Sequence, residues 1–149
     1  MVEILRVGIV GCGRIFNSHA LSYPEHPNSV LVGFYDRIRG RAEYWKERMD
    51  SIMKMVNKSA QKLQDKEEDQ RLLEKCKIYT KEAKVYNTMA DLLDNIDVLD
   101  ISTPNYAHTP YALWGINRGI SVMSEKPPAR CSLETKWICE AIKQLPKDK

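Results

Sequence analysis

The feature that most constrains this chain is a short apolar run that leads directly into two closely spaced glycines. Residues 5–10 (LRVGIV) are typical of a buried β-strand, and Gly11 and Gly13 come directly after it. Residues 14–23 then predict a helix. This order is typical of the phosphate-binding turn of dinucleotide-binding folds. There the first glycine gives a tight turn and the second lets phosphates approach the backbone.

The third position of the glycine motif departs from the usual pattern. A small residue normally stands there and permits close packing of helix on strand, but this chain has Phe16. Two glycines alone also fit a purely structural turn, so the interpretation depends on residues further along the chain.

Strand and helix alternate along most of the chain. Further strands are predicted at 30–35, 84–86, 96–101 and 120–123. Helices are predicted after Thr88 with Asp91 three residues on, over 106–118 with a stop at Gly119, and from a capping Ser132 to about Gln144. The alternation predicts an α/β fold, a Rossmann-type doubly wound parallel sheet with helices on both faces.

One stretch interrupts this alternation after the second strand. From residue 41 to about 76 the composition is helical and dense in both charges, without glycine or proline. We predict a helical insertion at about 50–80, as one long helix or as a hairpin that bends at 64–69. Its apolar stripe would comprise Ile52, Val56, Leu63 and Leu73. Mixed charge favours a solvent-exposed outer face, with an oligomer contact or a partner-docking arm as the alternative.

Length and composition fit one soluble domain spanning 1–149. The net charge of +3, with basic and acidic residues intermixed, argues against a nucleic-acid partner. No apolar run approaches the ~20 residues that cross a bilayer, and no signal peptide is visible, so we expect no membrane role and a cytoplasmic protein. The cysteines form no CxxC pair or cluster with histidines, which predicts buried free thiols and no metal site: Cys12, Cys76, Cys131 and Cys139.

An acidic residue at the end of the second predicted strand supports the nucleotide interpretation. Asp36 stands twenty-three positions after Gly13, close to the spacing expected of the acid that binds the adenosine ribose hydroxyls. The adjacent Arg37 could instead pair with a 2′-phosphate. The sequence therefore favours NAD as cofactor, with NADP possible. A loop-capping acid and a solvent-exposed base remain the structural alternatives.

Two further polar clusters begin where predicted strands end. The first holds Ser102, Thr103, Pro104 and Asn105, with His108 at the start of the next helix, and the second holds Glu125 and Lys126 before two prolines. Ligands bind at the carboxyl edge of such sheets. Both clusters are therefore candidate ligand-binding segments, although an isolated lysine or glutamate is more often a surface residue.

These segments together resemble the glucose-fructose oxidoreductase / inositol dehydrogenase / rhizopine-catabolism (Gfo/Idh/MocA) family. The resemblance rests on residues 7–15 (VGIVGCGRI), Tyr35-Asp36, Ser102-Thr103-Pro104-Asn105 with His108, and Glu125-Lys126-Pro127. It covers residues 5 to about 145, apart from the insertion. It implies an NAD(P)-dependent oxidoreductase that acts on sugars, polyols or similar small hydroxy compounds.

The resemblance also implies a role for each matching residue. Gly11, Gly13, Arg14 and Ile15 would cradle the pyrophosphate, and Asp36 with Arg37 would surround the adenosine ribose. The segment 102–105, with His108, would line the path to the nicotinamide, and Glu125 would contact the nicotinamide ribose. Lys126 would be the catalytic residue, which hydrogen-bonds the substrate hydroxyl and assists its deprotonation.

One departure from the family concerns length. Its members carry a second, mostly β-sheet domain that binds substrate, and only one predicted helix comes after Lys126 here. We expect the chain to be the cofactor domain of a larger enzyme, inactive alone and possibly part of a homo-oligomer, although a naturally short relative fits too. The alternatives are a non-catalytic NAD(P)-dependent sensor and, more weakly, an S-adenosylmethionine domain. Fold alone does not decide among them.

Overall fold

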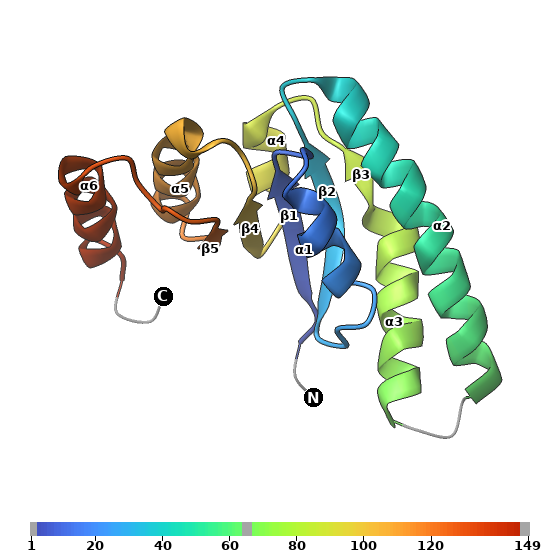
Figure 1. Ribbon diagram of the computed structural model, residues 1–149. Coiled ribbons are helices and arrows are strands. Elements are labelled where there is room, and N and C mark those ends of the chain that lie inside the picture. The colour runs from blue at the N-terminus through green and yellow to red at the C-terminus, as the bar shows by residue number, and fades with distance from the viewer. Residues whose placement is uncertain (1–2, 64–66, 147–149) are drawn as a thin grey trace.

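A five-stranded parallel sheet organises the chain (Figure 1). The computed structural model describes residues 3–63 and 67–146. The strands lie in the order β3-β2-β1-β4-β5, with bounds β1 (Leu5–Val10), β2 (Ser29–Tyr35), β3 (Lys84–Val85), β4 (Val98–Ile101) and β5 (Ser121–Ser124). The helices are α1 (Phe16–Ser22), α2 (Arg39–Leu63), α3 (Glu67–Glu82), α4 (Met89–Leu93), the 3₁₀ turn η1 (Asn105–Ala107), α5 (His108–Asn117) and α6 (Ser132–Lys143). The predicted Rossmann-type α/β fold is confirmed.

Helices cover both faces of the sheet. On one face Phe16 of α1 meets Trp45 of α2, with ring centroids 5.1 Å apart. On the other face Leu92 of α4 lies against Gly8 and Gly33, and α5 packs on β4 and β5. The strand order reverses between β1 and β4, which creates the switch point where open α/β sheets bind ligands at their carboxyl edge.

The insertion after β2 is a helical hairpin made of α2 and α3, which extends beyond the sheet at the end opposite the strands' carboxyl ends (Figure 1). It begins at Arg39, earlier than the predicted 50, because the chain turns into a helix directly after the loop at β2. The predicted bend at 64–69 falls partly outside the described residues, since 64–66 are not described. Residues 67–69 belong to the first turn of α3.

The apolar stripe predicted for the insertion is right only in part, since Ile52 and Val56 pack against the core. Leu63 is exposed, and the other three predicted residues are only half-buried. The buried face of α2 instead comprises Ala42, Trp45, Met49, Met53 and Ala60, at helical spacing. Two of these are methionines and two are alanines.

Phe16 packs away from the glycine turn. Its side chain is fully buried, and Trp45 of the insertion supplies its edge-to-face aromatic partner. The insertion therefore accommodates the large residue at the third motif position, and the space above Gly13 stays open.

Several local predictions can be compared with the structure directly. The Thr88 side chain accepts a hydrogen bond from the Asp91 N–H, as predicted for a helix start, and Gly119 has a φ of 68° after α5. Ser132 is not the cap of α6, because Cys131 occupies that position without a side-chain bond. Cys131 and Cys139 are exposed rather than buried, because α6 buries only a narrow face. Within the described ranges no helix is long and apolar enough to cross a bilayer.

A buried lysine connects the insertion to the Rossmann core through hydrogen bonds. Lys75 of α3 is 1% exposed, and its ammonium donates to the carbonyl oxygens of Tyr23, Pro24 and His26, directly after α1. Carbonyls at the end of a helix carry partial negative charge and need donors. Burial lowers the pKa of Lys75 to about 8, so the side chain is mostly charged at neutral pH.

We predict that Lys75→Met lowers the free energy of unfolding by about 3 kcal/mol at pH 7, because buried carbonyl groups lose their charged donor. Chemical denaturation monitored by circular dichroism measures the change. Lys77→Met, an exposed position on the same helix, should stay within about 0.5 kcal/mol of the wild type. Equal stability of the two variants would contradict this role for Lys75.

Candidate functional site

Backbone hydrogen bonds hold the carboxyl ends of four strands together. The Gly11 N–H donates to the Tyr35 carbonyl at 2.9 Å, joining the ends of β1 and β2. The Ser102 N–H donates to the Val10 carbonyl at 3.0 Å, and the Glu125 N–H donates to the Ile101 carbonyl at 3.0 Å. The glycine turn and both polar clusters predicted from the sequence therefore lie along one edge of the sheet.

The two glycines of the turn serve different purposes. Gly11 has a φ of 93°, and a Cβ placed on it would lie 2.7 Å from the Thr103 nitrogen. Only glycine fits there, because the backbone is left-handed and the loop after β4 is in contact. Gly13 has no neighbouring atom within 4 Å of such a Cβ, so it borders open space.

Asp36 links the glycine turn to the loop after β2. Its Oδ2 accepts the Cys12 N–H at 2.8 Å, and its Oδ1 accepts the Ile38 N–H at 2.7 Å. The carboxylate is half-buried, and an ionised carboxylate has room for more than two hydrogen bonds. Asp36 thus caps the loop and still has acceptor capacity for a ligand hydroxyl. The ribose-binding role assigned from the sequence stays a prediction.

A cleft of about 440 Å³ opens beside Asp36, between the loop after β2 and helix α5. Of the residues predicted from the sequence, Gly11, Asp36, Arg37, Thr103 and Pro104 line it. Four of its further lining residues, which were not predicted, are aromatic or basic: Arg41, Tyr106, Tyr111 and Trp114. The sequence offered one indication of this lining: Tyr111 and Trp114 are three residues apart on α5, and such spacing puts both side chains on the same face of a helix. Such a cleft, mainly apolar with a few polar groups, suits a planar heteroaromatic ligand.

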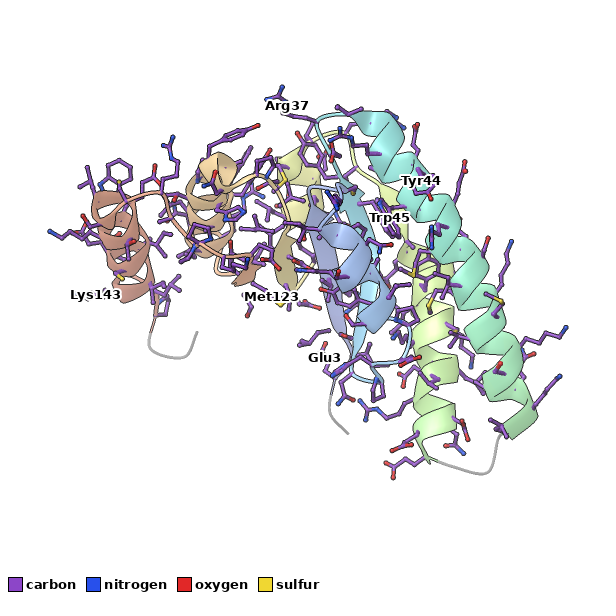
Figure 2. All side chains as sticks on the ribbon, viewed as in Figure 1. Glu3, Arg37, Tyr44, Trp45, Met123 and Lys143 are labelled. Carbon is purple, nitrogen blue, oxygen red and sulfur yellow. The ribbon has the colours of Figure 1, made fainter. Side chains whose placement is uncertain are left out.

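The remaining residues of the glycine turn border a second hollow. Gly13 and Arg14 line it together with Tyr44 and Trp45 of α2. This hollow shares Ile38 and Arg41 with the first cleft, so the two adjoin across the loop after β2. Ile15 and Asn105 are exposed and line neither. Figure 2 places Arg37 at this edge of the molecule, at the opposite end of the sheet from Glu3.

His108 joins the two predicted polar clusters. It is 1% exposed, with Nδ1 2.7 Å from the Pro127 carbonyl oxygen and Nε2 2.7 Å from the Thr103 carbonyl oxygen. Carbonyl oxygens only accept hydrogen bonds, so a neutral ring satisfies one of them and an imidazolium both. The structure therefore gives His108 a bracing position between the loops after β4 and β5. Its predicted contact with a cofactor stays a prediction.

Glu125 is anchored through both carboxylate oxygens. Oε2 accepts the Lys126 N–H at 3.1 Å, and Oε1 lies 2.9 Å from Nε2 of His19. The hydrogen bonds from His19 and from the Lys126 N–H hold the pKa of Glu125 below its usual range. The Lys126–Pro127 peptide bond is cis, and Lys126 is exposed. The backbone N–H of the predicted catalytic lysine is thus bound by the neighbouring Glu125 carboxylate.

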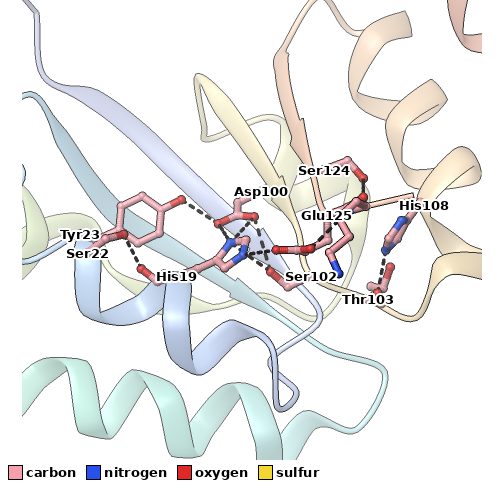
Figure 3. Close-up of polar contacts among 10 residues, drawn as sticks. His19, Ser22, Tyr23, Asp100, Ser102, Thr103, His108, Ser124 and Glu125 are labelled. Carbon is pink, nitrogen blue, oxygen red and sulfur yellow. Dashed lines mark hydrogen bonds and ion pairs between the residues drawn. The ribbon is translucent and has the colours of Figure 1, made fainter. Parts of the chain in front are cut away.

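His19, to which no sequence pattern assigned a function, lies between two carboxylates (Figure 3). Its Nδ1 is 2.9 Å from Oδ2 of Asp100, and its Nε2 faces Glu125. Tyr23 donates its hydroxyl to the same Asp100 oxygen at 2.7 Å. Asp100 is fully buried in β4. An aspartate within an apolar strand was the signal in the sequence, because a buried charge requires a partner.

The fold and this edge of the sheet define a dinucleotide-binding Rossmann domain, with a glycine turn, an acid after β2 and a cleft beside it. Comparison with known families agrees. The family model described as "Oxidoreductase family, NAD-binding Rossmann fold" (GFO_IDH_MocA) matches residues 5–147. The chain belongs to this family of NAD-binding oxidoreductases, and the resemblance found in the sequence is confirmed.

The individual relatives compared are all considerably longer. The chain is 25% identical over 124 residues to glucose-6-phosphate 3-dehydrogenase of Bacillus subtilis (strain 168), which covers 83% of this chain and 26% of that enzyme. Among solved structures, the WlbA dehydrogenase from Chromobacterium violaceum in complex with NADH and UDP-GlcNAcA has a TM-score of 0.69 and 20% identity, over 96% of this chain and 33% of that one. KijD10, a 3-ketoreductase from Actinomadura kijaniata in complex with NADP, has a TM-score of 0.68 and 16% identity, over 95% and 34%.

The two glycines provide a matched pair of variants. Gly11→Ala should lower the free energy of unfolding by about 2 kcal/mol or more, because its Cβ would meet backbone atoms at a left-handed position. Gly13→Ala has open space and should change it by less than about 1 kcal/mol. Thermal and chemical denaturation of both variants test this difference. Equal losses of unfolding free energy in the two variants would show that the turn does not require glycine at position 11.

Proposed function

We propose that this chain is the cofactor-binding part of an oxidoreductase that transfers hydride between NAD and a sugar, a polyol or a similar hydroxy compound. The observation that carries the proposal is the cleft beside Asp36, which adjoins the turn that only a glycine at position 11 can form. Membership of an NAD-binding oxidoreductase family supports it.

The adenosine half of the cofactor fits the cleft of about 440 Å³. Pro104, Tyr111 and Trp114 offer apolar surface for the adenine, and Asp36 offers acceptors to the ribose hydroxyls. The diphosphate would lie over Gly13, with Arg14 near it. Arg37 and Arg41 both line the cleft, so a 2′-phosphate could also find a partner, as the NADP of KijD10 suggests.

The nicotinamide half would point toward the loops after β4 and β5. Residues 102–105 would line its path, and Glu125 would accept a hydrogen bond from the nicotinamide ribose. When bound, NAD⁺ supplies the hydride acceptor for oxidation of an alcohol carbon. The cationic nicotinamide ring would favour the neutral amine of Lys126 once NAD⁺ is bound. That amine would accept a hydrogen bond from the substrate hydroxyl and take up its proton as the carbonyl forms, which is general base catalysis.

The substrate would be held by a part of the protein beyond these residues. The chain spans between a quarter and about a third of the relatives compared above. We propose that a further, mostly β-sheet domain completes the enzyme and supplies a second acid or base. The described chain would then bind cofactor with little or no turnover of its own.

Calorimetric titration tests the cofactor proposal directly. We expect NADH to bind the chain, and to bind more tightly than NADPH, because the Asp36 carboxylate repels a 2′-phosphate. Gly13→Ala should weaken NADH binding, since its methyl group would occupy the space proposed for the diphosphate, while the fold persists. Absence of heat with both cofactors would contradict the proposal.

Asp36 can be tested separately. Asp36→Ala should weaken NADH binding by roughly 1–3 kcal/mol, the contribution of a charge-assisted hydrogen bond, and should reduce the preference over NADPH. Because Asp36 also caps its loop, the free energy of unfolding is measured in parallel. Asp91→Ala serves as control, since that acid lies in the first turn of α4, accepts the hydroxyl of the cap residue Thr88 and does not line the cleft. An unchanged cofactor preference in Asp36→Ala would show that another group contacts the ribose.

A further inference from the structure

The histidine of α1 is placed between two acceptors. Nδ1 of His19 lies 2.9 and 3.1 Å from the Asp100 carboxylate oxygens, and Nε2 lies 2.9 Å from Oε1 of Glu125. Ionised carboxylates only accept hydrogen bonds, and a neutral imidazole has one N–H. Both contacts are therefore complete only when the ring is an imidazolium.

The surroundings of the ring favour that charged form. Burial alone would lower the pKa of His19, but the hydrogen bonds and charges of Asp100 and Glu125 outweigh it and raise the pKa above its ordinary value. Asp100 is fully buried, and it receives the Tyr23 hydroxyl in addition to His19. The Ser102 hydroxyl, 3.4 Å from Nδ1, adds no charge.

The charges balance across the cluster. Two carboxylates, Asp100 and Glu125, face one imidazolium, and Lys126 provides a second positive charge that acts on Glu125. Loss of one His19 proton would leave one of the two carboxylates without its imidazole donor. If the buried Asp100 keeps the remaining N–H, the side chain of Glu125 is held by the N–H of the next residue alone among the described contacts.

We propose that His19 is a positioning residue that, as an imidazolium braced by Asp100, fixes the Glu125 carboxylate at the nicotinamide end of the cofactor site. The inference rests on the proposed function, because it takes Glu125 as the partner of the nicotinamide ribose. Binding of the nicotinamide half of the cofactor would then depend on a residue of α1, while binding of the adenosine half would depend on Asp36 and on residues of α5.

This arrangement makes binding of the nicotinamide half depend on pH. The raised pKa of His19 means that the network is complete at low pH and is lost as pH rises through that pKa. ADP, which lacks the nicotinamide riboside, serves as the internal reference, since it occupies only the adenosine half. The ratio of NADH affinity to ADP affinity should therefore fall as pH rises from about 7, above the second ionisation of the ADP terminal phosphate at about 6, to about 9.

The experiment compares wild type, His19→Gln and the control His26→Gln by calorimetric titration with NADH and with ADP across this pH range. His26 is exposed on the loop after α1, and its ring contacts Asn28 and Ser29 at the end of that loop. We expect His19→Gln to bind NADH about tenfold more weakly at the lower end of this range, to bind ADP within about twofold of wild type, and to lose the pH dependence of the ratio. The control should match the wild type.

The other outcomes overturn the inference in distinguishable ways. Equal weakening of NADH and ADP would indicate a general structural role, and no change with either would remove His19 from the site. If His19→Gln fails to fold, the wild-type protein alone tests the inference. A ratio of NADH affinity to ADP affinity that does not change with pH would then contradict it. Wild-type protein that binds neither ligand would overturn the proposed function itself, and the inference with it.

Discussion

The close approach of the Gly11 backbone to the loop after β4 is the constraint on which the carboxyl edge of this sheet depends. A Cβ at this position would lie 2.8 Å from the Ser102 carbonyl carbon and 2.7 Å from the Thr103 nitrogen. Because Gly11 has no side chain, β1 can turn sharply beside β4. The turn brings the Cys12 N–H to Asp36, and the cleft forms where these loops meet α5.

The carboxyl edge of the sheet has two parts of different chemical character, one on each side of this turn. The half between Asp36 and Trp114 is mainly apolar and aromatic, with arginines at its rim, and it suits an adenosine. The half formed by α1, β4 and the loop after β5 is a network of opposite charges around His19. In the second half, the buried Asp100 is tolerated inside the sheet because His19 and Tyr23 both donate to it.

Structural features that depend on neighbouring residues could be predicted from the sequence. Contacts between residues far apart in the chain could not. The strands, the Gly11 turn and the position of Asp36 can be inferred from short patterns, because each depends on neighbouring residues. The network of His19 and Asp100 joins residues 81 apart in the chain, and Lys75 reaches the Pro24 carbonyl 51 residues away. The buried stripe of α2 was also missed, because its alanines and methionines look no more apolar than the exposed Leu63.

A crystal structure of the chain grown with NADH would test the proposed site most directly. We expect a dinucleotide whose diphosphate lies over Gly13, whose adenosine ribose contacts Asp36 and whose adenine occupies the cleft beside Trp114. A cleft that stays empty at saturating NADH, or a dinucleotide bound elsewhere on the chain, would contradict this arrangement.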